Sequence, residues 1–260
     1  MLQMKDFAID LAHKAGALLI KKFDQSIEVH YKGDINLITE ADKMSESLII
    51  ETIRRNFPDH GILSEESPAI LGGSPMRWII DPLDGTTNYA HGYPVFCVSI
   101  ALEKDGAVIL GVIYDPTRQD TFTAVRGEGA YWNGKRLAVS KTRDLTRSLL
   151  ATGFPYDIRE SKENNLNYFN VMAKEVQAIR RAGAAALDIA YVAAGRFDGF
   201  WELKLKPWDM AAGCLMVEEA GGKITDIFGA QWSFASPNIL VSNSCIHEQM
   251  ITVFKRTDAR

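Results

Sequence analysis

The stretch WIIDPLDGTTNY, residues 78–89, constrains the fold most, because it leads from three apolar residues directly into two acids. The apolar run is typical of the end of a buried strand, and the proline and glycine that follow predict an immediate turn. Asp81 and Asp84 are therefore expected close together at a strand end. Like charges a few ångströms apart repel, so such a pair needs a shared proton or a cation. The alternative interpretation is a turn rich in Asp, Gly and Thr that satisfies its own backbone.

The length of 260 residues allows one large domain or two small ones that share a core. A hydrophobic content of 47% and a charged content of 24% are typical of a soluble globular protein. The net charge of −4 comes from 29 basic and 33 acidic residues spread along the chain. Because binding to a phosphate backbone needs clustered Lys and Arg, no nucleic-acid surface is indicated.

The apolar runs and the cysteines indicate the cellular compartment of the protein. The longest apolar runs are much shorter than a membrane span, and the N-terminus MLQMKDFAID lacks the apolar core of a signal peptide. We therefore expect a cytoplasmic protein that does not bind membranes. The three cysteines, Cys97, Cys214 and Cys245, are odd in number, widely spaced and without a CxxC pattern. They predict reduced, partly buried thiols rather than disulfides or a zinc site.

The first half of the chain predicts two helices and then a meander. Residues 6–23 have the apolar spacing of an amphipathic helix, and a second helix is expected over residues 39–57, before a proline. Its start, TEAD, has the form of a capping box with Thr39 as N-cap and Asp42 at N3. From residue 95 to residue 139, short apolar runs alternate with turns such as KDG and NG, which predicts an antiparallel meander.

After about residue 148 the pattern changes to alternating strands and helices. We expect strands at 149–152, 200–203, near 224 and at 239–241, helices at 164–176, 184–194 and 207–220, and a last helix at the C-terminus. The predicted fold class is α+β or α/β, with helices packed on an antiparallel N-terminal sheet and a smaller mixed C-terminal sheet. Residues 1–145 would form an N-terminal α+β subdomain and residues 146–260 a C-terminal α/β subdomain, with the site between them.

Further acids stand where other elements begin or end. Glu65 follows the short apolar run ILS, and Asp209 falls in the first turn of a helix, where the helix dipole alone can explain it. The five histidines show no HxH or HxxxH spacing, so any metal site here is built from oxygen. Oxygen ligands select Mg²⁺ or Mn²⁺, and two such ions suit in-line displacement at phosphorus. The amides of Gly85 and Thr86 can bind a phosphate oxygen if a helix starts there.

These residues resemble the inositol monophosphatase family, part of a superfamily of lithium-sensitive, Mg²⁺-dependent phosphatases. Residues 78–102, WIIDPLDGTTNYAHGYPVFCVSIAL, are similar to its first signature, and residues 208–226, WDMAAGCLMVEEAGGKITD, to its second. EES and ITEAD occur in the family's order, and the similarity extends over nearly the whole chain. One departure is Ser64, where many members carry glycine; it bears only on the local loop.

The resemblance implies an αβαβα layered sandwich, usually a homodimer, and a Mg²⁺-dependent phosphomonoesterase that holds two or three ions, with Mn²⁺ as a possible substitute. It also implies the roles of individual residues. The first ion would be bound by Glu65, Asp81 and the Leu83 carbonyl, the second by Asp81, Asp84 and Asp209, and a weaker third by Glu65. The catalytic residues that activate the attacking water would be Asp42 and Thr86, with Glu65. The substrate would be bound by Asp84, Gly85, Thr86, Gly183, Ala184, Ala185, Glu202 and Asp209, with Glu202 on the ring hydroxyls.

Several alternatives stay open at this point. Asp42 is either a purely structural N3 residue or the partner of Thr86 in proton transfer. The substrate expected is inositol monophosphate, a small-molecule phosphate monoester, but a fructose-1,6-bisphosphatase, a dual inositol and fructose phosphatase, and a histidinol-phosphate phosphatase share this chemistry. Because a fold does not dictate function, a non-catalytic interaction protein that keeps the fold is the alternative from another class.

Overall fold

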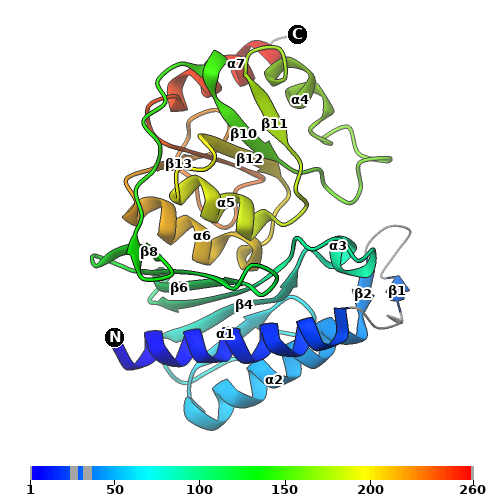
Figure 1. The fold of residues 1–260 in the computed structure, drawn as a ribbon, viewed down its shortest axis with the longest axis vertical. Coiled ribbons are helices and arrows are strands. Elements are labelled where there is room, and N and C mark those ends of the chain that lie inside the picture. The colour runs from blue at the N-terminus through cyan, green and yellow to red at the C-terminus, as the bar shows by residue number, and fades with distance from the viewer. Residues whose placement is uncertain (1, 24–28, 32–36, 259–260) are drawn as a thin grey trace.

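A computed structural model describes residues 2–23, 29–31 and 37–258, and its helices and sheets stack in five layers (Figure 1). Helices α1 (Leu2–Phe23) and α2 (Glu40–Asn56) cover one face of a seven-stranded sheet. Helices α5 (Ala185–Ala193) and α6 (Pro207–Glu219) lie between this sheet and a five-stranded one. Helices α4 (Leu166–Met172) and α7 (His247–Asp258) cover the far side of the second sheet. The αβαβα expectation is confirmed.

The seven-stranded sheet runs in the order β3-β4-β5-β6-β7-β8-β9 and is antiparallel except at one edge, where β3 is parallel to β4. Its strands are β3 (Gly61–Ser64), β4 (Met76–Asp84), β5 (Cys97–Lys104), β6 (Ala107–Asp115), β7 (Asp120–Val125), β8 (Gly129–Trp132) and β9 (Lys135–Arg136). The two predicted hairpin turns are confirmed, since Asp105-Gly106 and Asn133-Gly134 both adopt positive φ between paired strands.

Strand β4 differs from the expectation at its end. The predicted turn after Asp81 is wrong, because the strand continues to Asp84 through a bulge: Asp81 pairs with Ser99, and Asp84 then pairs with Cys97. Pro82 cannot donate a backbone hydrogen bond, and a bulge is where a strand accommodates such a residue. The short helix α3 (Thr86–Ala90) begins directly after Gly85, its N-cap.

The five-stranded sheet has the order β11-β10-β12-β14-β13, with parallel pairing at β11-β10-β12 and antiparallel pairing at β12-β14-β13. Its strands are β10 (Leu149–Thr152), β11 (Ala178–Arg180), β12 (Gly199–Leu203), β13 (Lys223–Thr225) and β14 (Asn238–Ser242). The helix expected over residues 164–176 is shorter, since α4 ends at Met172 and the chain turns into β11. Pairing of β11 with β10 overrides the local helical preference there.

Two smaller features complete the described chain. A two-stranded sheet pairs β1 (Val29–Tyr31) with β2 (Leu37–Thr39). A 3₁₀ turn, η1 (Leu145–Arg147), follows β9 and precedes β10 along the chain. Within the described ranges, no helix has the length and apolar character needed to cross a membrane. The cysteines are free thiols as predicted, with Cys97 and Cys214 buried and Cys245 exposed.

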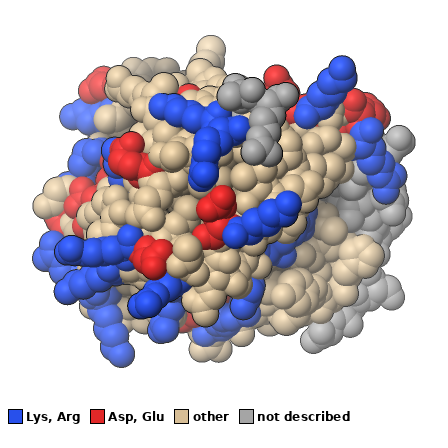
Figure 2. Space-filling model, turned by 90° about the horizontal axis from the view of Figure 1, so that it is seen from above, with Lys and Arg blue, Asp and Glu red and all other residues tan. Residues whose placement is uncertain are grey.

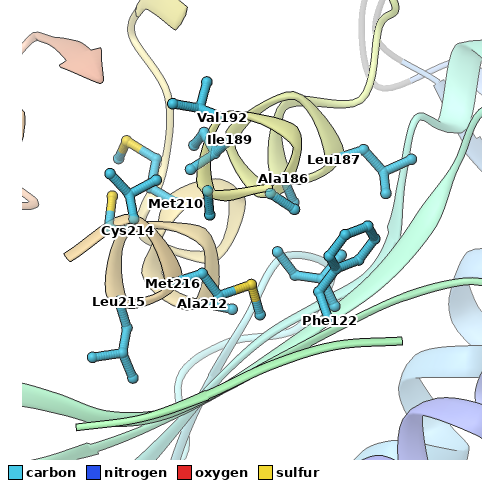
Figure 3. Close-up of a cluster of buried hydrophobic side chains, with 14 of the residues drawn as sticks. Phe122, Ala186, Leu187, Ile189, Val192, Met210, Ala212, Cys214, Leu215 and Met216 are labelled. Atoms are coloured by element: carbon cyan, nitrogen blue, oxygen red, sulfur yellow. The ribbon is translucent and has the colours of Figure 1, made fainter. Parts of the chain in front are cut away.

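Three apolar cores hold the five layers together. One packs α1 and α2 on the first sheet, and another packs α4 and α7 on the second. The central core is formed by α5 and α6 against both sheets; in Figure 3, Leu187 of α5 and Met216 of α6 extend toward Phe122 of β7. This core joins residues on both sides of position 145, where the division into two subdomains is expected. That division remains a prediction.

Charged side chains of both signs lie on the surface. Figure 2 shows Lys and Arg interspersed with Asp and Glu on the face that is seen from above. In the C-terminal half, Arg256 pairs with Glu175 at 3.7 Å and Lys223 with Glu248 at 2.7 Å. Exposed pairs of this kind add about 0–1 kcal/mol each, so the layered cores carry the stability of the fold.

Candidate active site

A pocket of about 500 Å³ lies between the two sheets and brings most of the predicted site residues together. Its walls come from the ends of β4 and β12, the starts of α3, α5 and α6, and the segment after β10. The predicted residues that line it are Glu65, Asp81, Leu83, Asp84, Gly85, Thr86, Gly183, Ala184, Ala185, Glu202 and Asp209. Asp42 is the exception, because it lies behind this wall and reaches the pocket through Thr86.

The two aspartates of β4 have different partners. Asp81 is 1% exposed, and its Oδ1 accepts a hydrogen bond of 3.0 Å from the Leu83 N–H, within the bulge. Asp84 reaches across to the other half of the protein, where it accepts hydrogen bonds from the N–H groups of Ala185 at 3.3 Å and Ala186 at 2.8 Å. Asp84 thus caps α5, whose own N-cap residue offers no capping side chain.

This cap between the two halves could not be predicted from the sequence. Asp84 and the start of α5 are about a hundred residues apart, and no local capping signal precedes the helix. The contact ties the first sheet to the helix layer at the pocket wall. Asp84 therefore has a structural role in addition to the ligand role expected for it.

Asp209 enters the pocket from the start of α6. Its Oδ2 accepts a hydrogen bond of 2.7 Å from the Lys206 N–H, so the helix-start interpretation is part of its role. The carboxylate also lines the pocket, where its charge acts on Asp81 of β4. Glu65 joins them from the segment that directly follows β3, the strand parallel to β4.

The acids repel one another strongly. Burial, together with the charges of Glu65, Asp84 and Asp209, raises the pKa of Asp81 well above its usual range. Burial raises the pKa of Asp84 to about 6 in spite of its backbone hydrogen bonds, and that of Asp209 to about 7. A cation relieves such repulsion, and oxygen donors of this kind match the preferences of Mg²⁺.

The arrangement of the carboxylates fits a metal ion by donor chemistry rather than by a finished coordination geometry. Within the described residues, no three His, Cys, Asp or Glu side chains are already grouped closely enough to hold an ion. Asp81, Asp84 and Asp209 each accept backbone hydrogen bonds instead. Oxygen-only donors, mutual repulsion and a shared pocket nevertheless make this the place in the described chain that suits a divalent cation.

Thr86 links the pocket to Asp42. Its Oγ1 donates a hydrogen bond to Asp42 Oδ1 at 3.0 Å and lies 3.1 Å from the Leu83 carbonyl oxygen. Asp42 is fully buried and forms the predicted capping box with Thr39, which is confirmed as the N-cap of α2. Burial raises the pKa of Asp42, and its hydrogen bonds with Thr39 and Thr86 lower it. The geometry therefore suits a proton acceptor for the Thr86 hydroxyl.

Glu202 is a further acid of the pocket. It lies in β12, is 9% exposed, and its carboxylate rests against the backbone of Gly153. Burial and the charges of Asp209 and Asp84 raise the pKa of Glu202 to about 8, while Arg181 opposes this rise. Gly183, with φ +85°, turns the chain into α5 beside the Arg181 guanidinium.

Three further pocket residues were not expected from the sequence: Tyr156, Arg181 and Asp188. Tyr156 lies near the four acids, and its removal from water together with their charges raises its pKa, although half of its side chain is exposed. No pattern marks Tyr156 or Arg181. Asp188 does carry a signal, since it is a single acid within the otherwise apolar run AALDIAYVA of α5.

The fold and this acidic pocket define a class of phosphatase, and the comparisons agree. The model of the inositol monophosphatase family matches residues 1–258, so the chain belongs to that family. The Nus factor SuhB of Escherichia coli K12 is 43% identical over 251 residues, which cover 95% of this chain and 94% of that protein.

Solved structures give the same result. The extragenic suppressor protein SuhB of Bartonella henselae superposes with a TM-score of 0.93 at 42% identity, over 97% of this chain and 98% of the other. The inositol monophosphatase of Anabaena superposes with a TM-score of 0.89 at 42% identity, over 98% and 96% of the two chains. The inositol monophosphatase of Thermotoga maritima gives a TM-score of 0.90 at 37% identity, over 100% and 99%.

Proposed function

We propose that the protein is a Mg²⁺-dependent phosphomonoesterase that hydrolyses inositol monophosphate to inositol and phosphate. The observation that carries this proposal is the convergence of Glu65, Asp81, Asp84 and Asp209 on one pocket beside the Thr86–Asp42 hydrogen bond. Acids in this number serve a cation, and a hydroxyl held by a buried carboxylate serves proton transfer. Together they support metal-assisted hydrolysis.

The roles proposed for the acids are those that the family resemblance implies. Glu65, Asp81 and the Leu83 carbonyl would hold one Mg²⁺, and Asp81, Asp84 and Asp209 another. When bound, Mg²⁺ supplies Lewis-acid stabilisation of the phosphate oxygens. Mn²⁺ would serve as a substitute, and the homodimer and the inhibition by lithium expected from the resemblance remain predictions.

The protein's own groups perform the remaining steps. Thr86 Oγ1 would orient the attacking water, and Asp42 Oδ1, 3.0 Å from it, would accept the hydroxyl proton as the water is deprotonated. The backbone N–H groups of Gly85 and Thr86, at the start of α3, would hold the phosphate. Buried Asp42 is protected from bulk water, which keeps this proton transfer local.

Glu202 favours a polyol over other leaving groups. It lines the pocket from β12, where we place the organic part of a phosphate monoester. A carboxylate there accepts hydrogen bonds from ring hydroxyls and opposes a second phosphate. This supports inositol monophosphate over fructose 1,6-bisphosphate, while histidinol phosphate and dual activity stay alternatives.

A panel of substrates tests the proposal. Phosphate release should be measured from inositol 1-phosphate, fructose 1,6-bisphosphate, histidinol phosphate and adenosine 3′,5′-bisphosphate, each with and without Mg²⁺. We expect Mg²⁺-dependent release that is fastest with inositol 1-phosphate. Faster release from another member of the panel would reassign the substrate within the same chemistry, and no release from any of them would contradict the phosphatase assignment.

A second candidate role comes from the name of the Escherichia coli relative, a Nus factor. A role of that kind, carried by a surface rather than by the pocket, would not need Asp81. Expression of the Asp81→Asn chain in Escherichia coli that lacks its own SuhB separates the two roles. Rescue by both wild type and Asp81→Asn supports the second role, whereas rescue by wild type alone favours catalysis as the shared function.

A further inference from the structure

Asp188 is a buried acid for which the proposed chemistry has no use. It lies in the first turn of α5, is 2% exposed and lines the pocket. Its Oδ1 is shielded from solvent and accepts no hydrogen bond from any residue in the described part of the chain. An unpartnered buried carboxyl group lowers stability, so its presence at a pocket wall indicates a ligand that completes it.

Glu202 lines the same pocket as Asp188. Apart from burial, the charge of Glu202 is the largest influence that raises the pKa of Asp188, whereas Glu202 itself is raised by Asp209 and Asp84. Two buried carboxyl groups that repel each other in one pocket share a proton more readily than they ionise together, so the pair offers both a hydrogen-bond donor and an acceptor.

The backbone of Gly153 holds the Glu202 carboxyl group in this position. A Cβ on Gly153 would lie 2.2 Å from Glu202 Oε1 and 2.3 Å from Oε2, so the carboxylate lies directly on the glycine backbone. That backbone is fixed by Asn165, whose Nδ2 donates to the Gly153 carbonyl at 2.6 Å and whose Oδ1 accepts from Trp201 Nε1 at 2.7 Å. Trp201 directly precedes Glu202 in β12, so the network fixes both sides of the contact.

We propose that Asp188 is a specificity-determining residue that, together with Glu202, hydrogen-bonds a hydroxyl of the leaving group. The inference rests on the proposed phosphatase function and deepens it. A hydroxyl is both donor and acceptor, so it matches this pair. A leaving group without hydroxyls leaves both carboxyl groups unpaired and is disfavoured.

Two substitutions of similar size separate this role from a structural one. Asp188→Leu removes both polar atoms of the side chain, and Asp188→Asn keeps a donor. The readouts are kcat/KM for inositol 1-phosphate divided by kcat/KM for phenyl phosphate, which lacks hydroxyls, and the Tm of each variant. Asp198→Asn, a buried aspartate outside the pocket, is the matched control.

We expect Asp188→Leu to lower the ratio by about tenfold to a hundredfold and to raise Tm, because an unpartnered acid is replaced by an apolar side chain. Asp188→Asn should keep the ratio within about threefold of wild type, as expected when a donor remains. Asp198→Asn should lower Tm and keep the ratio. An unchanged ratio in Asp188→Leu, or a lower Tm with parallel losses on both esters, would overturn the inference. If wild type hydrolyses neither ester, the phosphatase assignment fails first and the inference fails with it.

Discussion

Thr86 Oγ1 donates a hydrogen bond of 3.0 Å to Asp42 Oδ1, which joins the first residue of α3 to the third residue of α2. The other oxygen, Oδ2, accepts hydrogen bonds from the N–H and the hydroxyl of Thr39. One carboxylate therefore caps a helix and holds the hydroxyl that lines the pocket. The structural and the catalytic interpretation of Asp42 do not exclude each other.

Replacement of Asp42 by asparagine should separate these two effects. We expect kcat to fall by about 10²–10⁴, because the proton acceptor for Thr86 is lost. The free energy of unfolding should fall by about 1 kcal/mol through the weaker cap. Thr39→Ala is the control, since it removes the same cap and leaves the Thr86 contact; it should lower stability by a similar amount and keep kcat near wild type.

The double variant Asp42→Asn with Thr86→Ala tests whether the two residues act as one unit. Residues that share one proton-transfer step are strongly non-additive, so the double variant should be no slower than the slower single variant. Losses in kcat that multiply would show that the two residues act separately. Near-full kcat in Asp42→Asn would leave Asp42 as a cap alone.

Gly153→Ala should displace the Glu202 carboxylate, because the added Cβ would lie 2.2–2.4 Å from three of its atoms. The Asn165 network keeps the Gly153 backbone from moving away. We expect kcat/KM for inositol 1-phosphate to fall at least about tenfold relative to phenyl phosphate, which corresponds to one lost charge-assisted hydrogen bond. Gly73→Ala is the control, because its added Cβ has open space around it; it should leave kcat/KM unchanged for both esters. Steady-state kinetics of the two variants tests this prediction.

Stability in acid should depend on His247, which is fully buried between Thr225 and Ser242, with ring nitrogens 2.9 and 2.8 Å from the two hydroxyls. Burial lowers the pKa of His247 to about 4, from 6.5. Between these values the unfolded chain binds a proton that the folded protein does not. The free energy of unfolding should therefore fall as pH falls through this window, by up to about 3 kcal/mol.

His247→Gln removes this titration. Urea unfolding at pH 7.5 and pH 4.5 should show a smaller loss of stability in the variant than in wild type, by about 2–3 kcal/mol. The variant should also start from a lower value at pH 7.5, since its hydrogen bonds are altered. Equal losses in the two proteins would show that other groups cause the acid sensitivity.

Local signals predicted much of the fold. Thr39 and Asp42 predicted the start of α2, Asn133-Gly134 predicted a hairpin, and the periodic spacing of apolar residues predicted α1. The misses have non-local causes. Strand β11 exists because β10 pairs with it, and β4 continues past Pro82 because a bulge absorbs the proline.

The same contrast between local and non-local signals applies to the site. Asp81, Asp84, Glu65 and Asp209 could be found from their positions at the ends of predicted elements, and the resemblance supplied Glu202. The cap of α5 by Asp84 and the approach of Glu202 to Gly153 depend on how the two sheets stack. No local pattern encodes such contacts, because their partners are tens of residues apart.

The most direct test of the central claim is the Mg²⁺ dependence of phosphate release from inositol 1-phosphate by wild type, Asp81→Asn and Asp198→Asn. The account predicts that wild type loses its activity in EDTA and regains it with added Mg²⁺. Asp81→Asn should stay folded and lose at least about 10²-fold in kcat at saturating Mg²⁺, as removal of a metal-ligating carboxylate implies. Asp198→Asn should keep the wild-type Mg²⁺ response. Full activity of wild type in EDTA, or wild-type kcat in Asp81→Asn, would contradict the account.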